Sequence, residues 1–255
     1  MEKSNSYIFV YSLVLVVLIA TLLSVAAFSL KPAQQANIKI EKMQNILNAV
    51  KIETEASEAE AVFNEKLKDF FFVKKGTADV ATAESINQTD MFNLQNDGEN
   101  LPVYEVEGEN DTYFVIPLNG AGLWGPIWGY ISIAKSDCNT VLGTVFDHAS
   151  ETAGLGAEIV KPKFRDRFEG KHIFKDGEFT SVKVMKGGAT NDYNEIDAIS
   201  GSTKTCDGVT NMLNDCLSGY AVYFLSVAGG AVQETVADSV AAPVADTLNV
   251  EPLNK

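Results

Sequence analysis

Apolar residues form an unbroken run near the start of the chain. Residues 7–30 carry no charge and are apolar almost throughout. At about 1.5 Å of rise per residue, a helix of this length spans a hydrocarbon core of about 30 Å. A cleaved signal peptide is the alternative, and Ser-Val-Ala at 24–26 resembles a cleavage site. The run is longer than a signal core, however, and the residues before it are hardly basic, so we expect residues 1–31 to be a retained membrane anchor.

Two helical patterns follow the anchor. Apolar residues between 40 and 50 recur at helical spacing, which predicts a short amphipathic helix after Pro32. Residues 56–71 predict a second helix, acidic at its start and lysine-bearing toward its end, as the helix dipole favours. Residues 76–100 are polar and mixed, so loops are expected there. Taken together, residues 32–100 are expected to form a helical and linker region that packs on the next domain.

The middle of the chain changes to the alternation of apolar and polar residues that is typical of strands. Four segments have this pattern, with turn-forming residues between them: 101–108, 112–118, 127–134 and 139–149. Residues 172–187 predict a further hairpin, because Asp176-Gly177 has strand-forming residues on both sides.

The chain closes with a predicted helix over residues 206–223 and a tail over 229–255, which is rich in Ala, Val, Gly and Pro. Strands in succession and a terminal helix, without regular alternation of strand and helix, indicate an α+β fold with a largely antiparallel sheet and flanking helices. We expect this domain to occupy residues 101–228.

Charge and composition exclude some functions. The chain has 34 acidic and 20 basic residues and a net charge of −14, so no basic surface is expected to bind nucleic acid. The cysteines, Cys138, Cys206 and Cys216, form no CxxC pair and no haem-attachment motif. With His148 and His172 as the only histidines, no metal site is expected from ligands within this chain.

The sequence DAISGSTKT, residues 197–205, stands before the last predicted helix and is rich in hydroxyl groups. A Walker loop needs glycine directly before Lys204, where this chain has Thr203. A serine of the SxxK type would have to stand at Gly201. Two interpretations remain: hydroxyl groups that cap the helix, and a helix N-terminus whose free amides hold an anion such as an esterified phosphate.

Two glycine-rich segments have an equally unusual composition. Residues 119–130 read NGAGLWGPIWGY, and residues 147–159 read DHASETAGLGAEI. Glycine allows the backbone to approach a neighbour closely, and tryptophan offers a flat apolar face. Each segment is therefore either a tightly turned corner of the core or part of the wall around a planar ligand.

Together these segments resemble the FMN-binding domain family, in particular the C subunit of the Na⁺-translocating NADH:quinone reductase, and more broadly the related Rnf complex. The resemblance covers residues 101–226 through GLWGPIWGYI, HASETAGLGAEI, VKVMKGGA and DAISGSTKT, and extends loosely to the anchor and to IKIEKMQNIL. It implies one FMN per chain, attached through its phosphate to the last Thr of a D-x-x-[ST]-G-A-T motif by a flavin transferase that uses FAD.

The motif matches this chain at four positions and departs from it at one. Ser202 stands where the family has Ala, and the matching residues are Asp197, Ser200, Gly201 and Thr203. The resemblance therefore implies Thr203 as the acceptor, with Ser202 and Thr205 as the alternatives. Thr190 ends a similar GGAT sequence, but Val184 stands where the motif needs Asp, so we reject it.

The resemblance also implies which residues surround the flavin ring. Ala153 replaces the usual Pro of ETPGLG, and the rest of that loop is retained: Glu151, Thr152, Gly154, Leu155 and Gly156. Trp124 is expected beside the ring and Lys186 near the phosphate or the ring edge. For Glu151, a carboxylate that only caps its loop is the other interpretation.

In function, the resemblance implies a flavoprotein that relays single electrons from NADH toward quinone within a membrane complex, coupled to Na⁺ export. No residue of this chain is expected to be catalytic. Its partners would be the other subunits, the flavin transferase, and the bilayer around residues 7–30. Lys3 and Lys31 lie on opposite sides of the span and leave its orientation open, whereas the family implies a periplasmic domain on the inner membrane. The alternatives are the equivalent Rnf subunit and a membrane-anchored module without a cofactor.

Overall fold

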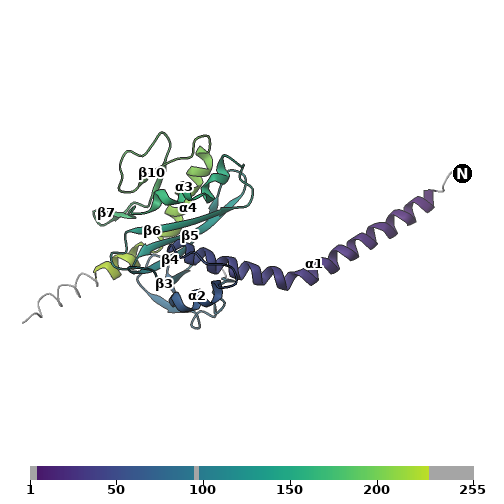
Figure 1. Ribbon diagram of the computed structural model, residues 1–255, viewed down its shortest axis with the longest axis horizontal. Coiled ribbons are helices and arrows are strands. Elements are labelled where there is room, and N and C mark those ends of the chain that lie inside the picture. The colour runs from purple at the N-terminus through teal and green to yellow at the C-terminus, as the bar shows by residue number, and fades with distance from the viewer. Residues whose placement is uncertain (1–4, 95–97, 230–255) are drawn as a thin grey trace, which may run out of the picture.

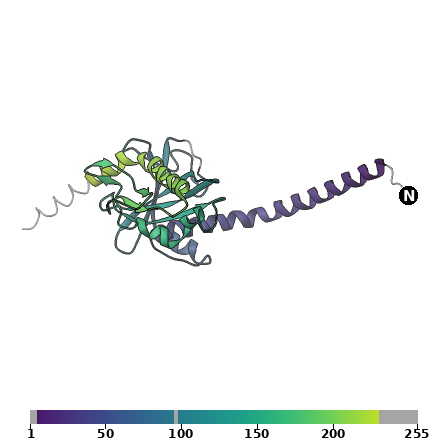
Figure 2. The same ribbon diagram turned by 90° about the horizontal axis from the view of Figure 1, so that it is seen from above.

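The computed structural model describes residues 5–94 and 98–229 of the chain. The predicted tail over 229–255 thus lies outside the described residues, apart from residue 229 itself. One long helix extends away from a mixed domain of helices and strands, and the last described residues lie on the opposite side of that domain (Figures 1 and 2).

Helix α1, Asn5–Ala49, is a single helix of 45 residues with Pro32 inside it. The prediction of a separate amphipathic helix after Pro32 was therefore wrong. Proline removes one backbone hydrogen bond, but the sequence on both sides of it is helix-forming. The last turns of α1 are also held in place because Met43, Ile46 and Leu47 are buried against the domain. Residues 7–30, by contrast, are exposed and apolar, and α1 is long and apolar enough to cross a membrane.

A six-stranded antiparallel sheet forms the centre of the domain, with the strand order β2-β1-β3-β4-β5-β6. The predicted strands of the middle of the chain are confirmed. The six strands are β1 (Leu67–Lys74), β2 (Val80–Thr82), β3 (Asn100–Glu107), β4 (Thr112–Ala121), β5 (Pro126–Ala134) and β6 (Val141–His148).

Strand β1 corrects the predicted helix over residues 56–71. Helix α2, Ala59–Lys66, ends where the sequence becomes aromatic and β-branched, and these residues pair with β3 instead. Phe71 packs on one face of the sheet and Phe72 lies toward the other, so both faces of β1 are covered. The loop expected over residues 76–100 contains β2, which pairs with β1.

Two apolar clusters cover the two faces of the sheet. Helix α4, Thr203–Ser218, packs on one face through Val209, Met212 and Leu213. The end of α1 packs on the other face. The helix predicted over residues 206–223 therefore begins three residues earlier, and it ends at Ser218 because a turn at 219–220 separates it from a further helical stretch at 221–229.

Short elements connect β6 to α4. They are the 3₁₀ helix η1 (Gly156–Val160), α3 (Pro162–Arg165), η2 (Asp166–Phe168), β7 (Phe174–Lys175), β8 (Glu178–Phe179), β9 (Lys183–Met185) and β10 (Glu195–Asp197). Asp176 and Gly177 have φ of 52° and 81°, as the predicted hairpin turn requires. This hairpin is shorter than predicted, since β9 pairs in parallel with β10. The fold class is α+β, as predicted.

Candidate functional site

The N-terminus of α4 is the place where the predicted site residues meet. Ser200 and Gly201 form the turn before the helix, and Thr203 is its first residue. Gly201 has a φ of 80°, a conformation that favours glycine. The first amides of a helix have no partner within the helix, and they carry the positive end of its dipole. The turn therefore presents Thr203 at a position suited to an anion.

The hydroxyl groups at this helix end differ in accessibility. Ser202 is 5% exposed, and its Oγ has no hydrogen-bond partner among the described residues. Thr205 is also buried, and its Oγ1 donates a hydrogen bond to Glu151 Oε2 at 2.8 Å. Thr203 is half-exposed. Of the three candidate acceptors, Thr203 is thus the one that another molecule can reach.

Glu151 lies beneath this helix end and connects it to the two glycine-rich segments. The residue is 8% exposed. One carboxylate oxygen accepts the Thr205 hydroxyl, and the other accepts the Trp124 backbone N–H at 2.9 Å. The Glu151 N–H itself donates to His148 Nδ1 at 3.2 Å. Both carboxylate oxygens are therefore bound to the protein, and the geometry favours a structural role for Glu151 within its loop.

Three glycines allow these segments to approach so closely. A Cβ atom would lie 2.3 Å from Glu151 Oε1 if added at Gly122, and 2.1 Å from Glu151 Oε2 if added at Gly156. At Gly208, within α4, it would lie 2.3 Å from the Ala121 carbonyl oxygen. Gly122 and Gly208 were not predicted as site residues. A glycine inside a helical pattern signals such a contact, but the sequence does not say which segment approaches it.

The two loops that meet at this helix end carry exposed apolar side chains. Trp124 is 66% exposed and Leu155 is 41% exposed, and Leu123 next to Trp124 is similarly open to solvent. Leu155 lies against the turn, since its Cδ2 is 3.0 Å from the Cβ position of Gly201. The backbone carbonyl of Thr152 accepts two amides of its own loop, and its side chain is exposed. Leu123 was not predicted, although it belongs to the GLWG sequence.

Asp197 and Lys186 belong to neighbouring strand ends: Asp197 is the last residue of β10, and Lys186 follows β9, which pairs with β10. Asp197 Oδ1 accepts the Ala189 N–H at 2.7 Å and so holds the glycine loop that carries the exposed Lys186. Thr190 in this loop donates its hydroxyl to Glu195 Oε2 at 2.8 Å. Its hydroxyl is therefore engaged within its own loop.

Comparison with known proteins gives the class of this domain. A family model described as "FMN-binding domain" matches residues 122–218, which include the GLWG sequence, the ETAGLG loop and the whole of α4. The chain is therefore an FMN-binding domain protein with a long apolar N-terminal helix.

Similarity to individual proteins identifies the family within this class. The C subunit of the Na⁺-translocating NADH-quinone reductase of Haemophilus ducreyi is 32% identical over 233 residues, which are 83% of this chain and 90% of that protein. The crystal structure of the C subunit from Parabacteroides distasonis is 40% identical, covers 77% of this chain and 97% of its own, and superposes with a TM-score of 0.69. Shewanella oneidensis NqrC, 24% identical over 75% of this chain and 98% of its own, has the same fold with a TM-score of 0.62.

This chain belongs to the NqrC family, the C subunits of Na⁺-translocating NADH-quinone reductases, and the resemblance noted in its sequence is confirmed.

Proposed function

We propose that this chain is a membrane-anchored subunit of a Na⁺-translocating NADH-quinone reductase, with FMN joined through its phosphate to Thr203. In this role it relays electrons that originate from NADH toward quinone, and the complex couples this transfer to Na⁺ export. The observation that carries the proposal is that Thr203 is the accessible hydroxyl at the N-terminus of α4, between a buried Ser202 and an engaged Thr205.

The residues at this helix end fit both parts of FMN. The free amides of the first turn of α4 suit a phosphate ester on Thr203. The exposed faces of Trp124 and Leu155 suit a flat apolar ring, and the exposed Thr152 side chain is available to its polar edge. The N–H and the carbonyl of Leu155, by contrast, already bond to Thr152 and Glu158 within the loop. Glu151 holds the Trp124 loop against α4. FMN, when bound, supplies one-electron redox chemistry, and the protein holds and orients it.

Lys186 and Asp197 would complete the site from the paired strands β9 and β10. Lys186 is exposed, and its ammonium group suits a phosphate or the ring edge, while Asp197 orients its loop. A covalent link suits an electron carrier that must not dissociate while its ring is left partly open to neighbouring redox centres. The attachment would be made by a flavin transferase that uses FAD.

The apolar part of helix α1 is the basis for proposing where the protein lies in the cell. We propose that residues 7–30 span the inner membrane and contact lipid, that the domain faces the periplasm, and that other subunits of the reductase supply the neighbouring redox centres. No residue of this chain is assigned a catalytic role. The similarity to several NqrC sequences favours this complex over the Rnf complex.

Flavin attachment is tested by co-expressing the full chain with a flavin transferase and looking for flavin fluorescence on a denaturing gel. The wild-type chain is expected to give a fluorescent band and Thr203→Val none. Ser202→Ala and Thr190→Val are the matched controls and should keep the band. Mass mapping of the peptide covering residues 187–212 should place one added FMN on Thr203.

Two outcomes would contradict the proposal. A Thr203→Val variant with an undiminished band would exclude Thr203 as the acceptor. A wild-type chain without fluorescence, in the presence of an active transferase, would instead support the module without a cofactor.

A further inference from the structure

A cavity of about 370 Å³ opens between strands β3 and β4, and it shares no lining residue with the cluster around Thr203. Its origin is visible in the strand register. The pairing of β3 with β4 stops at Tyr104 and Val115. Continued by two residues, the same register would place Pro102 directly opposite Pro117. Neither proline has an N–H to donate, so the ladder cannot continue and the two strands separate.

Both strands remain ordered beyond this point because each keeps its other neighbour. Strand β3 pairs with β1 as far as Asn100, and β4 pairs with β5 as far as Ala121. The sheet is therefore split locally between two intact halves. The cavity lies at this split.

Side chains from the region of α4 bind backbone groups at the split. The Tyr220 hydroxyl donates to the Pro102 carbonyl oxygen at 2.8 Å. The Asn119 N–H donates to Cys216 Sγ at 3.4 Å, and the thiol donates back to the Asn119 carbonyl oxygen at 3.5 Å. Burial raises the pKa of the Cys216 thiol, which keeps it protonated and able to donate. With these backbone groups bound, the cavity is left with largely apolar walls.

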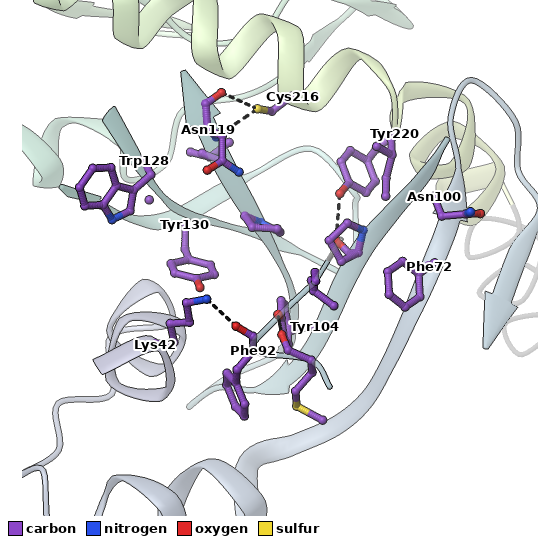
Figure 3. A pocket seen from close by; sticks show the side chains of 17 residues that line it. Lys42, Phe72, Phe92, Asn100, Tyr104, Asn119, Trp128, Tyr130, Cys216 and Tyr220 are labelled. Atoms are coloured by element: carbon purple, nitrogen blue, oxygen red, sulfur yellow. Dashed lines mark hydrogen bonds between the residues drawn. The ribbon is translucent and has the colours of Figure 1, made fainter. Parts of the chain in front are cut away.

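Aromatic side chains are six of the 17 that line the cavity, and one cation stands at its rim. Figure 3 shows Trp128 and Tyr130 on one side, Phe72 and Tyr220 on the other, and Lys42 at the end nearest α1. Lys42 Nζ donates to the Phe92 carbonyl oxygen at 2.5 Å. An ammonium group has three donors, so others remain available. Within the described part of the chain, no carboxylate lies in ion-pair distance of Lys42.

A second hollow leads to this cavity along α1. It has a volume of about 510 Å³ and shares Lys42 and Phe92 with the cavity. The rest of its lining includes Gln35, Ile38 and Lys39 of α1 and the carboxylate of Asp90. It lies toward the membrane-spanning part of the same helix. A ligand can therefore approach Lys42 from the membrane side of the domain.

We propose that the cavity is a binding site for a flat aromatic molecule of about two fused rings, with an anionic or carbonyl oxygen directed at Lys42. The volume lies in the range of small-molecule sites, which are mostly apolar with few polar groups. The rings of Trp128 and Phe92 are only partly buried and favour a ring over a flexible acyl chain, and the single cation at the rim sets the orientation of the oxygen.

The two tryptophans of the chain provide the test. Trp128 lines the cavity and Trp124 lies at the other site, so the full-length FMN-bearing chain labelled with 5-fluorotryptophan carries one reporter for each. On titration with 2-naphthoate in detergent micelles, the ¹⁹F resonance of Trp128 should shift saturably and that of Trp124 should stay in place. Octanoate, which has the same carboxylate on an acyl chain, should not compete.

Variants of two lysines on α1 test the role assigned to Lys42. Lys42→Met should weaken naphthoate binding about tenfold, as expected for the loss of a hydrogen bond to a charged group. Lys42→Arg keeps the charge and should retain binding. Lys31→Met, on the same helix but outside the lining of both hollows, is the matched control and should leave binding unchanged.

The proposal is overturned if the Trp128 resonance does not move, or if both tryptophan resonances move in parallel, as partition into the micelle would cause. It is also overturned if octanoate competes as well as the aromatic acid, or if the two lysine-to-methionine variants weaken binding equally. None of these outcomes bears on flavin attachment to Thr203, which the denaturing gel reports separately.

Discussion

Glu151 connects two loops to helix α4, and its surroundings explain why the site residues lie together. A buried carboxylate is costly unless its oxygens are hydrogen-bonded, and here the Thr205 hydroxyl and the Trp124 amide satisfy them. The sequence predicted Glu151 as a site residue but left two interpretations open. The bonds favour the structural one, since neither oxygen points away from the protein's own donors.

Replacement of Glu151 by alanine is expected to destabilise the domain. The change leaves a buried hydroxyl and a backbone amide without their acceptor, which costs about 1–3 kcal/mol. For a domain of this size, that corresponds to a fall in melting temperature of about 2–4 °C per kcal/mol. Thermal unfolding of the full chain, followed by circular dichroism in detergent, measures it. Glu151→Gln keeps one acceptor oxygen, so its melting temperature should fall less than that of Glu151→Ala. Equal falls in melting temperature for the two variants would contradict this account.

A side chain at Gly156 should disrupt the same contact. The Cβ of Gly156→Ala would lie 2.1 Å from Glu151 Oε2 and 2.6 Å from Thr205 Oγ1, so both groups must move. Overpacking of this kind costs about 1–3 kcal/mol. The variant should melt lower and show a weaker flavin band.

Gly154 in the same loop provides the control. It has open space around it and a φ of 77°, which asparagine tolerates better than most residues. Gly154→Asn should therefore keep both the melting temperature and the flavin band. If Gly154→Asn lowers the melting temperature and the flavin band as much as Gly156→Ala does, the loop is sensitive to any substitution. The contact of Gly156 with Glu151 would then not be the cause of the loss.

Helix α4 and the turn between β4 and β5 are positioned by their contact with each other. The apolar spacing in the sequence predicted the helix and its buried face, because periodicity reports which residues share a side. It did not predict that Gly208 meets the Ala121 carbonyl, since that contact depends on how the helix crosses the sheet. Strand β1 was missed for a related reason: its aromatic run fits a helix until pairing with β3 becomes available.

Gly208→Ala is expected to destabilise the domain, although replacing glycine by alanine usually stabilises a helix. In an exposed helix the change stabilises by up to about 1 kcal/mol. Here the added Cβ would lie 2.3 Å from a backbone oxygen, so α4 must move away from the β4–β5 turn. A lower melting temperature and less attached flavin are expected. Asp207→Ala, one residue earlier and exposed, should leave both quantities near their wild-type values.

The whole molecule consists of one long helix, apolar over residues 7–30, that continues into an acidic domain. Helix α1 runs without interruption from the apolar segment to the sheet, and its last turns belong to the core through Met43, Ile46 and Leu47. The domain is thus attached by a continuous helix, where the sequence had predicted a break at Pro32. Tertiary packing of the end of α1 stabilises the helix across the proline.

Removal of residues 1–31 should yield a domain that stays in solution without detergent. The deletion removes the exposed apolar side chains between residues 7 and 30 and retains the buried end of α1. The net negative charge of the chain also opposes association. Sedimentation of lysates expressing each chain measures the effect. The full chain should pellet with the membranes, and a truncated chain found in the same pellet would show that a second membrane-binding surface exists.

The sequence by itself determined the apolar span, the central strands, the α+β class and the segments that carry the site, because each depends on local periodicity or on residues close together in the chain. Tertiary structure decided which hydroxyl is reachable, since the burial of Ser202 and the bond from Thr205 to Glu151 arise from segments about 50 residues apart. It also decided that β3 and β4 separate opposite their prolines, because a proline weakens a sheet only where a partner strand would need its N–H.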